Sequence, residues 1–219
     1  MKKIGVLVSG GGSNLQAIID ASETGLFDAR VGVVISNKAG VFALERAAKH
    51  HIPAEVINHR DYLNNADFSE AVFLCFRGYD IDVVCLAGFL RILDPCFIEK
   101  YPERILNIHP ALLPAFGGKG MYGHHVHEAV ITSGAKFSGA TVHLVTPETD
   151  VGPIVRQGIV EVSDDDTPDT LAAKVLTIEH QIYPEAIKLL IEERIVVDGN
   201  RVRLKKLSTP RLSRDNEVM

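Results

Sequence analysis

Cysteine is scarce in this chain of 219 residues. The three cysteines, Cys75, Cys85 and Cys96, are odd in number and form no C-x-x-C pair, so neither a disulfide framework nor a cysteine metal site is expected. No apolar run approaches membrane-spanning length, and the short run after the basic start is interrupted by Gly10-Gly11-Gly12. The sequence therefore predicts a cytoplasmic protein with no signal peptide and no membrane partner.

Positive charge is in deficit as well. The formal net charge is −5 and the isoelectric point is near 6.0. This balance argues against a broad nucleic-acid surface, so no nucleic-acid partner is expected. Glycine and proline are not in excess, and hydrophobic residues make up 46% of the chain, enough for one large core or two small ones.

Short apolar runs alternate with segments whose apolar residues recur at helical spacing. The N-terminal half predicts strands over 4–8, 31–35, 54–57 and 83–87, with a helix between each pair. The third of these helices, over 68–79, is expected to follow a polar loop over 58–66. The C-terminal half predicts strands over 105–109, 137–146 and 154–162, a helix over 168–194 and a hairpin over 195–204. This order indicates an α/β protein with a mostly parallel, twisted, Rossmann-like sheet, helices on both faces and antiparallel C-terminal strands.

The first strand is followed by a glycine-rich loop and then by a helix. This geometry aims free backbone N–H groups at an anion. The loop lacks the Gly-Lys-Ser/Thr ending of a phosphate loop of the Walker type and the third glycine of a dinucleotide loop, and no acidic residue ends the second strand. We therefore expect a site for a single phosphate, and the alternative is a tight turn that needs glycine only for a positive φ.

Asn107 and His109 stand two residues apart at the end of a predicted strand. Strand side chains alternate, so both should point to the same side of the sheet. An amide donor for a developing oxyanion beside a proton carrier suits acyl-type transfer, although a polar strand end could also be purely structural. Asp150, in a turn between two prolines, could orient and charge a histidine or could simply be solvated.

Three further segments bear on ligand or metal binding. Arg91, flanked by apolar residues, belongs either to a slot for a flat apolar ligand with an anionic end or to the surface. The glycine-rich stretch 117–123 indicates a mobile loop that faces a ligand. His124, His125 and His127 follow it, but no H-E-x-x-H motif occurs and His125 and His127 do not share a helical face, so no metal site is expected.

Several of these segments together resemble one family. They are the Ser-Gly-Gly-Gly-Ser-Asn-Leu-Gln loop, Ala87 to Leu93, Asn107-Ile108-His109-Pro110, Asp150, and Glu179-His180 followed by Tyr183-Pro184. From Ile4 to about Leu204 the chain resembles the phosphoribosylglycinamide formyltransferases, the folate-dependent glycinamide ribonucleotide transformylases of purine synthesis. The Asn-Ile-His-Pro segment alone is typical of formyltransferases in general, and the glycine loop and the Glu179 segment make the resemblance specific.

The resemblance implies the reaction and its partners. The formyl group of 10-formyltetrahydrofolate, a co-substrate and not a permanently bound cofactor, would pass to the amine of N1-(5-phospho-D-ribosyl)glycinamide. The products would be the formylglycinamide ribonucleotide and tetrahydrofolate, in de novo purine biosynthesis. The partners would be these small molecules, with the chain a monomer or a homodimer. One formyltransferase domain would span 1–204, with a phosphate-binding half over about 1–100 and a folate and catalytic half over about 101–204, followed by a disordered tail over 205–219.

The resemblance also implies roles for individual residues. Catalysis would fall to Asn107, His109 and Asp150; the phosphate and ribose to Gly12, Ser13, Asn14 and Glu179; the folate to Leu90, Arg91, Ile92, Leu93, Asn107 and Asn65. Asn65 stands where the family often has arginine or lysine, and Arg60 is the alternative for that contact. The Leu113–Pro114 bond is expected to be cis. Asp150, paired with His109, should raise the pKa of His109 and keep it protonated.

Three competing functions are weighed against this one. Methionyl-tRNA formyltransferase shares an Asn-x-His-Pro site but carries a basic tRNA-binding domain after the catalytic one, which this acidic chain is not expected to have. Formyltetrahydrofolate hydrolase has an extra N-terminal regulatory domain, whereas the phosphate loop here begins at Ser9. A nucleotide sensor that had lost its chemistry would not need Asn107, His109 and Asp150 together.

Overall fold

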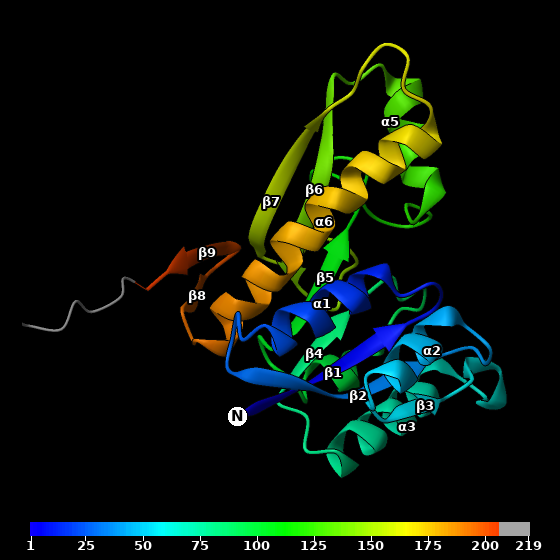
Figure 1. Ribbon diagram of the computed structural model, residues 1–219, viewed down its shortest axis with the longest axis vertical. Helices are drawn as coiled ribbons and strands as arrows, with labels where there is room; N and C mark the ends of the chain where they lie inside the picture. The colour runs from blue at the N-terminus through cyan, green and yellow to red at the C-terminus, as the bar shows by residue number, and fades with distance from the viewer. Residues whose placement is uncertain (206–219) are drawn as a thin grey trace, which may run out of the picture.

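A continuous nine-stranded sheet organises residues 1–205, the part of the chain that the computed structural model describes (Figure 1). The strand order is β3-β2-β1-β4-β5-β6-β7-β9-β8. The strands are β1 (Lys2–Val8), β2 (Ala29–Ser36), β3 (Ala54–Val56), β4 (Val83–Leu86), β5 (Ile105–His109), β6 (Phe137–Leu144), β7 (Ile154–Glu161), β8 (Ile195–Asp198) and β9 (Arg201–Leu204). The first five strands in this order, from β3 through β2, β1 and β4 to β5, run parallel to one another. Strand β6 runs antiparallel to both β5 and β7. The predicted fold class is confirmed.

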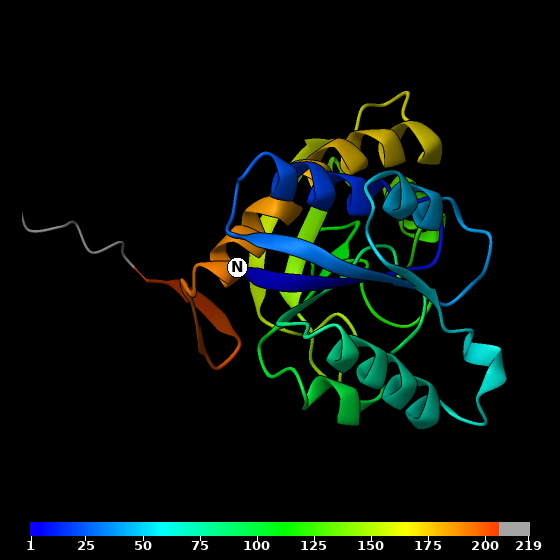
Figure 2. The same ribbon diagram turned by 60° about the horizontal axis from the view of Figure 1, so that its bottom comes forward.

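Helices cover both faces of the sheet, as Figure 2 shows. They are α1 (Ser13–Glu23), α2 (Phe42–Lys49), α3 (Asn65–Gly78), α4 (Pro95–Ile98), α5 (His124–Ser133) and α6 (Pro168–Ile191), with a 3₁₀ turn, η1 (His59–Asp61). Two hydrophobic cores result: one under α1, α2, α5 and α6, and the other under α3 and α4. Strand β1 contributes side chains to both cores, because its successive residues Val6 and Leu7 point to opposite faces of the sheet. None of the helices within 1–205 is both long and apolar enough to cross a bilayer.

The predicted site residues Asn107 and His109 lie at the edge of the sheet where its parallel strands end. Strands β1, β4 and β5 end there, and β6 lies against β5 with Asn107 opposite His143 and His109 opposite Thr141. Open α/β sheets bind ligands beyond the carboxyl ends of their strands. The Leu113–Pro114 peptide bond in the loop after β5 is cis, as expected.

One boundary differs in a way that bears on function. The polar stretch 58–66 was expected to be a loop, but it contains η1 and the start of α3 at Asn65. The cause is a cap: the Asn64 side chain accepts a hydrogen bond from the Asp67 backbone N–H and so begins the helix there. Asn65 is therefore the exposed first residue of a helix. Except for Lys205, the tail predicted over 205–219 lies outside the described residues.

Candidate active site

A cleft of about 620 Å³ lies at the carboxyl edge of the sheet. It is lined by the end of β5, the segment 88–93 after β4, the loops 118–123 and 145–150, and one side of α6. This volume falls within the range of small-molecule sites in proteins. The polar residues predicted on β5 and the apolar segment after β4 therefore face the same space.

Asn107 and His109 both line the cleft, as their spacing on one strand predicted. The Nδ2 atom of Asn107 lies 3.1 Å from Nε2 of His143 on the neighbouring strand. An Asn amide group has two N–H bonds, so one can donate to His143 while the other stays available to a ligand. His143 Nδ1 lies 2.9 Å from the carbonyl oxygen of Leu144, which can only accept, and this places the His143 proton on Nδ1.

His109 is buried between the sheet and the loop that follows β5. Its Nε2 atom donates to the carbonyl oxygen of Phe116 at 2.8 Å, and its Nδ1 atom lies 3.6 Å from Oδ2 of Asp150. Burial lowers the pKa of His109, and the opposing effects of the Asp150 charge and the Phe116 carbonyl do not restore it. The expectation that Asp150 keeps His109 protonated is therefore wrong: desolvation exceeds the carboxylate's attraction, and the imidazole of the free protein is neutral near pH 7.

Asp150 lies between the two histidines. Its Oδ2 accepts a hydrogen bond of 2.9 Å from the Gly118 N–H, and its Oδ1 lies 3.7 Å from Nε2 of His143. Burial raises the pKa of Asp150, but the contact with His143, the hydrogen bond from the Gly118 N–H and the charge that His109 carries once it is protonated at low pH outweigh it and lower the pKa overall. The carboxylate is thus ionised and ready to stabilise a proton that arrives on either ring.

The glycine loop follows β1 beside the cleft. Gly12 has φ = 72°, and a Cβ atom there would lie 2.7 Å from Cβ of Ala43, so the loop requires glycine at this position. Gly12 caps α1 and Ser13 is its first residue, which leaves the amino-terminal N–H groups of the helix for an anion. Gly12 and Ser13 are not among the residues that line the 620 Å³ cleft, whereas Asn14, one residue further on, is.

Asn14 and Glu179 form a buried pair between α1 and α6. Asn14 Nδ2 donates to Glu179 Oε2 at 2.6 Å, and both side chains line the cleft. Burial raises the pKa of Glu179, although the bond from Asn14 opposes that rise. Within the described part of the chain the Asn14 Oδ1 atom has no hydrogen-bond partner, so the pair presents polar atoms suited to a hydroxylated ligand.

The apolar wall of the cleft contains the segment predicted to bind a flat ligand. Leu90, Arg91, Ile92 and Leu93 all line it, and the side chains of Leu90 and Ile92 are exposed. Exposed branched side chains beside a cleft indicate an apolar ligand surface. Asn65 and Arg60, the two residues considered for the same ligand, are exposed on α3 and η1 and do not line the cleft.

The sequence reasoning missed His143 and Ser9. His143 appeared only as one member of an alternating strand, and its role follows from the pairing of β6 with β5. Ser9 directly follows β1. Its Oγ atom donates a hydrogen bond to Asn37 Oδ1 at 2.7 Å and accepts one from the Leu90 N–H at 2.9 Å. Ser9 thus connects the glycine loop to the apolar wall.

Ser9→Ala should lower the free energy of unfolding by about 1–3 kcal/mol, because a buried acceptor and a backbone N–H would lose their partner. The Leu90 amide should also exchange with solvent faster. Urea unfolding and amide hydrogen exchange measure the two effects. Ser133→Ala is a suitable control, since that hydroxyl is exposed and both of its partners, the Val130 carbonyl and the Ala135 N–H, lie within three residues of it in the chain. Equal losses in the two variants would refute the connecting role of Ser9.

The histidines at the start of α5 are held by carboxylates and by packing. His124 lies 3.0 Å from Glu128 and 3.1 Å from Asp169, and His127 is buried at the cleft wall. Across residues 1–205 no cluster of three or more His, Cys, Asp or Glu side chains could hold a metal ion.

Residues 2–187 match the formyl transferase family model. The chain is 38% identical over 217 residues to phosphoribosylglycinamide formyltransferase of Haemophilus influenzae, covering 99% of this chain and 100% of the relative. It is 41% identical to the human trifunctional purine biosynthetic protein adenosine-3 over 90% of this chain, and there it spans 19% of the relative's length.

Solved structures agree with the sequence matches. Glycinamide ribonucleotide transformylase 1 of Symbiobacterium toebii is 42% identical with a TM-score of 0.90, and the match covers 94% of this chain and 95% of the other. A formyltetrahydrofolate deformylase of Pseudomonas syringae is 25% identical with a TM-score of 0.84, over 94% of this chain and 66% of the other.

Proposed function

Because this chain belongs to the formyl transferase family, we propose that it transfers the formyl group of 10-formyltetrahydrofolate to the amine of N1-(5-phospho-D-ribosyl)glycinamide. The observation that carries the proposal is the position of Asn107, His109 and Asp150. They meet in one cleft, between an anion loop on one side and an exposed apolar wall on the other. The reaction needs a ribonucleotide and a folate to meet at such a centre.

The two substrates bind on opposite sides of the catalytic residues. The phosphate binds at Gly12 and Ser13, where free N–H groups and the positive end of α1 favour an anion. The ribose hydroxyls bind the Asn14–Glu179 pair. The pterin of the folate lies against the apolar wall at 90–93, with its carboxylate-bearing end near Arg91. All of these groups belong to one chain, so a monomer or a homodimer suffices.

In the proposed reaction His109 begins neutral and Asp150 begins ionised. The neutral amine attacks the formyl carbon, a C–N bond forms and the carbonyl oxygen becomes an oxyanion. The free N–H of Asn107 donates to that oxyanion. A water passes the proton of the attacking nitrogen to Nδ1 of neutral His109, and the carboxylate of Asp150, 3.6 Å from Nδ1, stabilises the imidazolium. The imidazolium returns this proton through the water to N10 of the folate. The bond between N10 and the formyl carbon then breaks as the oxyanion becomes a carbonyl again.

Hydrolysis of the same folate is the second candidate, because a deformylase shares the fold. The two functions differ in the acceptor of the formyl group. The anion loop and the buried Asn14–Glu179 pair favour a phosphorylated, hydroxylated acceptor over water.

The decisive assay follows tetrahydrofolate formation from 10-formyltetrahydrofolate with and without the ribonucleotide. We expect turnover only when the ribonucleotide is present, with one formylated ribonucleotide made per tetrahydrofolate. Equal tetrahydrofolate release in its absence would assign the hydrolase. If both substrates bind and neither changes, the proposed transfer is wrong.

A further inference from the structure

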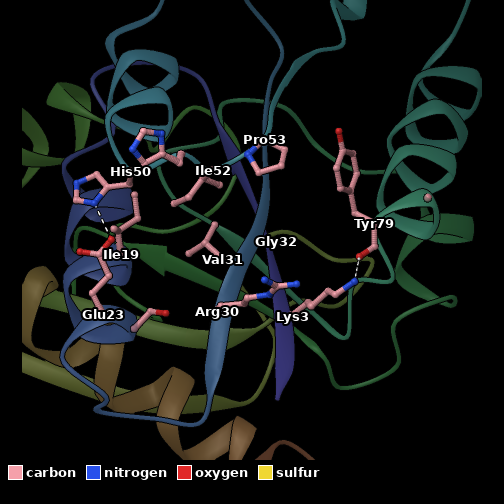
Figure 3. Close-up of a pocket in the computed structure, with 13 residues that line it drawn as sticks. Lys3, Ile19, Glu23, Arg30, Val31, Gly32, His50, Ile52, Pro53 and Tyr79 are labelled. Atoms are coloured by element: carbon pink, nitrogen blue, oxygen red, sulfur yellow. Dashed lines mark hydrogen bonds and ion pairs between the residues drawn. The ribbon is translucent and has the colours of Figure 1, made fainter.

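The space at the starts of β1 and β2 is partly filled by the protein itself. A cavity of about 410 Å³ lies there, and Figure 3 shows the side chains around it. A Cβ atom on Gly32 would already lie 2.9 Å from Cδ1 of Ile81 and 3.3 Å from Cβ of Lys3. Lys3 is itself held by the Tyr79 carbonyl, to which its Nζ atom donates at 2.9 Å. The cleft at the carboxyl edge therefore remains the place for a ligand, and its shape depends on the strand ends beneath it.

Tyr183 is fully buried on α6, within the core that this helix forms with the sheet (Figure 1). It belongs to the Tyr183-Pro184 segment of the sequence, and the proposed reaction gives it no role. Its hydroxyl donates to the carbonyl oxygens of Leu86 and Leu106, each at 3.0 Å. A phenol has one proton, so the two carbonyls share it. Phenylalanine would fill the same space without that proton, so the hydroxyl acts on the two carbonyls and adds little to the packing.

Leu86 and Leu106 lie where β4 and β5 separate. Strand β4 ends at Leu86, and its partner Asn107 is the last residue that β5 pairs with β4. The next residue, Ala87, donates its N–H to the Leu7 carbonyl on β1 instead. A carbonyl oxygen can accept two hydrogen bonds, so the phenol adds to the ladder between β4 and β5 and does not replace it. Tyr183 thus joins the last pair of residues before the two strands part at the cleft.

The Leu106 carbonyl and the Asn107 N–H belong to one planar peptide unit. Anchoring this oxygen to α6 restrains the rotation of that unit, and with it the direction in which the Asn107 side chain leaves β5. The Leu86 carbonyl belongs in the same way to the peptide unit that leads into the segment 88–93, which lines the cleft. One hydroxyl group therefore fixes the strand end that carries Asn107 relative to the start of the apolar wall.

We propose that Tyr183 is a positioning residue, which holds the Asn107 amide in line with both substrates through the Leu106 carbonyl. Glu179 lies about one turn earlier on α6 and lines the cleft. The helix that carries the ribose-binding carboxyl group thereby also anchors the strand that carries the oxyanion donor. The catalytic consequence rests on the proposed function, because Asn107 meets an oxyanion only if a formyl group is transferred. The placement of Asn107 by Tyr183 does not rest on it.

Tyr183→Phe keeps the ring and removes only the hydroxyl group. We expect kcat to fall by about 10- to 10²-fold, up to the cost of a misplacement of about 1 Å, while the KM of each substrate stays within about twofold. The KM should hold because every side chain that contacts a substrate is still present. Ile187→Val is the matched control, since this fully buried apolar side chain lies about one turn further along α6 and its change loosens the same core without removing a hydrogen bond. An equal loss of kcat in Ile187→Val, measured where circular dichroism shows both variants folded, would overturn the proposal.

A double-mutant cycle with Asn107→Ala tests the route of the effect. If Tyr183 acts through Asn107, Tyr183→Phe should cause no further loss of kcat in a chain that already carries Asn107→Ala. Single-turnover measurements give the rate of the double variant. A further fall by the same factor as in the unaltered chain would overturn the proposal, because Tyr183 would then act elsewhere. A normal kcat in Tyr183→Phe alone would overturn it as well.

Nitrogen-15 NMR of the Asn107 side-chain amide reports its placement without any turnover. The signals are assigned by their loss in Asn107→Ala. We expect them to shift in Tyr183→Phe and to stay in place in Ile187→Val. Unchanged signals in Tyr183→Phe would refute the positioning role even in a chain that transfers formyl groups. Shifted signals in a chain that transfers none would support the placement of Asn107 by Tyr183 and refute the proposed function instead.

Discussion

Asn107→Ala should lower kcat by about 10²- to 10³-fold, the usual cost of about 2.7–4 kcal/mol for removing one oxyanion donor. The KM of each substrate should stay nearly constant. The geometry explains why kcat should fall while KM does not change. One N–H of Asn107 donates to His143, 3.1 Å away, so the amide is already oriented before the oxyanion forms. A donor oriented in this way stabilises charge that develops only in the transition state.

Steady-state kinetics with both substrates varied measures the effect. Asn200→Ala, in the exposed turn between β8 and β9, is the matched control and should turn over like the unaltered chain. A variant Asn107→Ala with normal kcat would remove Asn107 from catalysis. A large rise in KM with normal kcat would instead make it a substrate-binding residue.

His109→Gln should lower kcat by about 10²- to 10⁴-fold, the range for loss of a positioned proton carrier. The substrate amine must be neutral to attack, so it contributes its own limb to the pH profile of kcat/KM, near the usual α-amino pKa of about 8. Because burial lowers the pKa of His109, protonation of this ring should add a second, acidic limb with a midpoint below 6.5. That acidic limb should be absent in His109→Gln. His125→Gln, on the exposed side of α5, is the control and should keep both the rate and the limb.

Asp150→Asn provides the companion measurement. The Asp150 charge raises the pKa of His109 against burial, so its removal should move the acidic limb to still lower pH. It should also slow turnover, because the imidazolium formed in the reaction loses its carboxylate. An acidic limb that moves to higher pH, or does not move, would contradict the pairing of Asp150 with His109.

Asp150 and His109 both make the folded chain less stable as the pH falls. The pKa of Asp150 lies below its usual value, so its contribution is present above about pH 3.9 and is lost as pH falls through the folded-state pKa. The pKa of His109 is also lowered, so the unfolded chain binds a proton that the folded chain refuses as pH falls below about 6.5. Both effects reduce the free energy of unfolding on acidification.

Most of the fold and the central residues of the site could be predicted from the sequence, because both depend on local patterns. Period-two alternation placed Asn107 and His109 on one side of β5. The strand-loop-helix order placed Gly12 and Ser13 at the start of α1. Where the pattern was read too coarsely, as at Asn64, a capping side chain began α3 earlier and carried Asn65 onto an exposed helix end.

What the sequence by itself determined is therefore the set of elements and the residues that each presents at its end, since periodicity and turn chemistry act over a few neighbours. The tertiary structure alone decided three things. It paired β6 with β5 and so brought His143 to Asn107. It buried His109 deeply enough that desolvation exceeds the attraction of Asp150. It joined the two walls of the cleft through Ser9. Each of these depends on distance and burial between segments far apart in the chain, which no local pattern encodes.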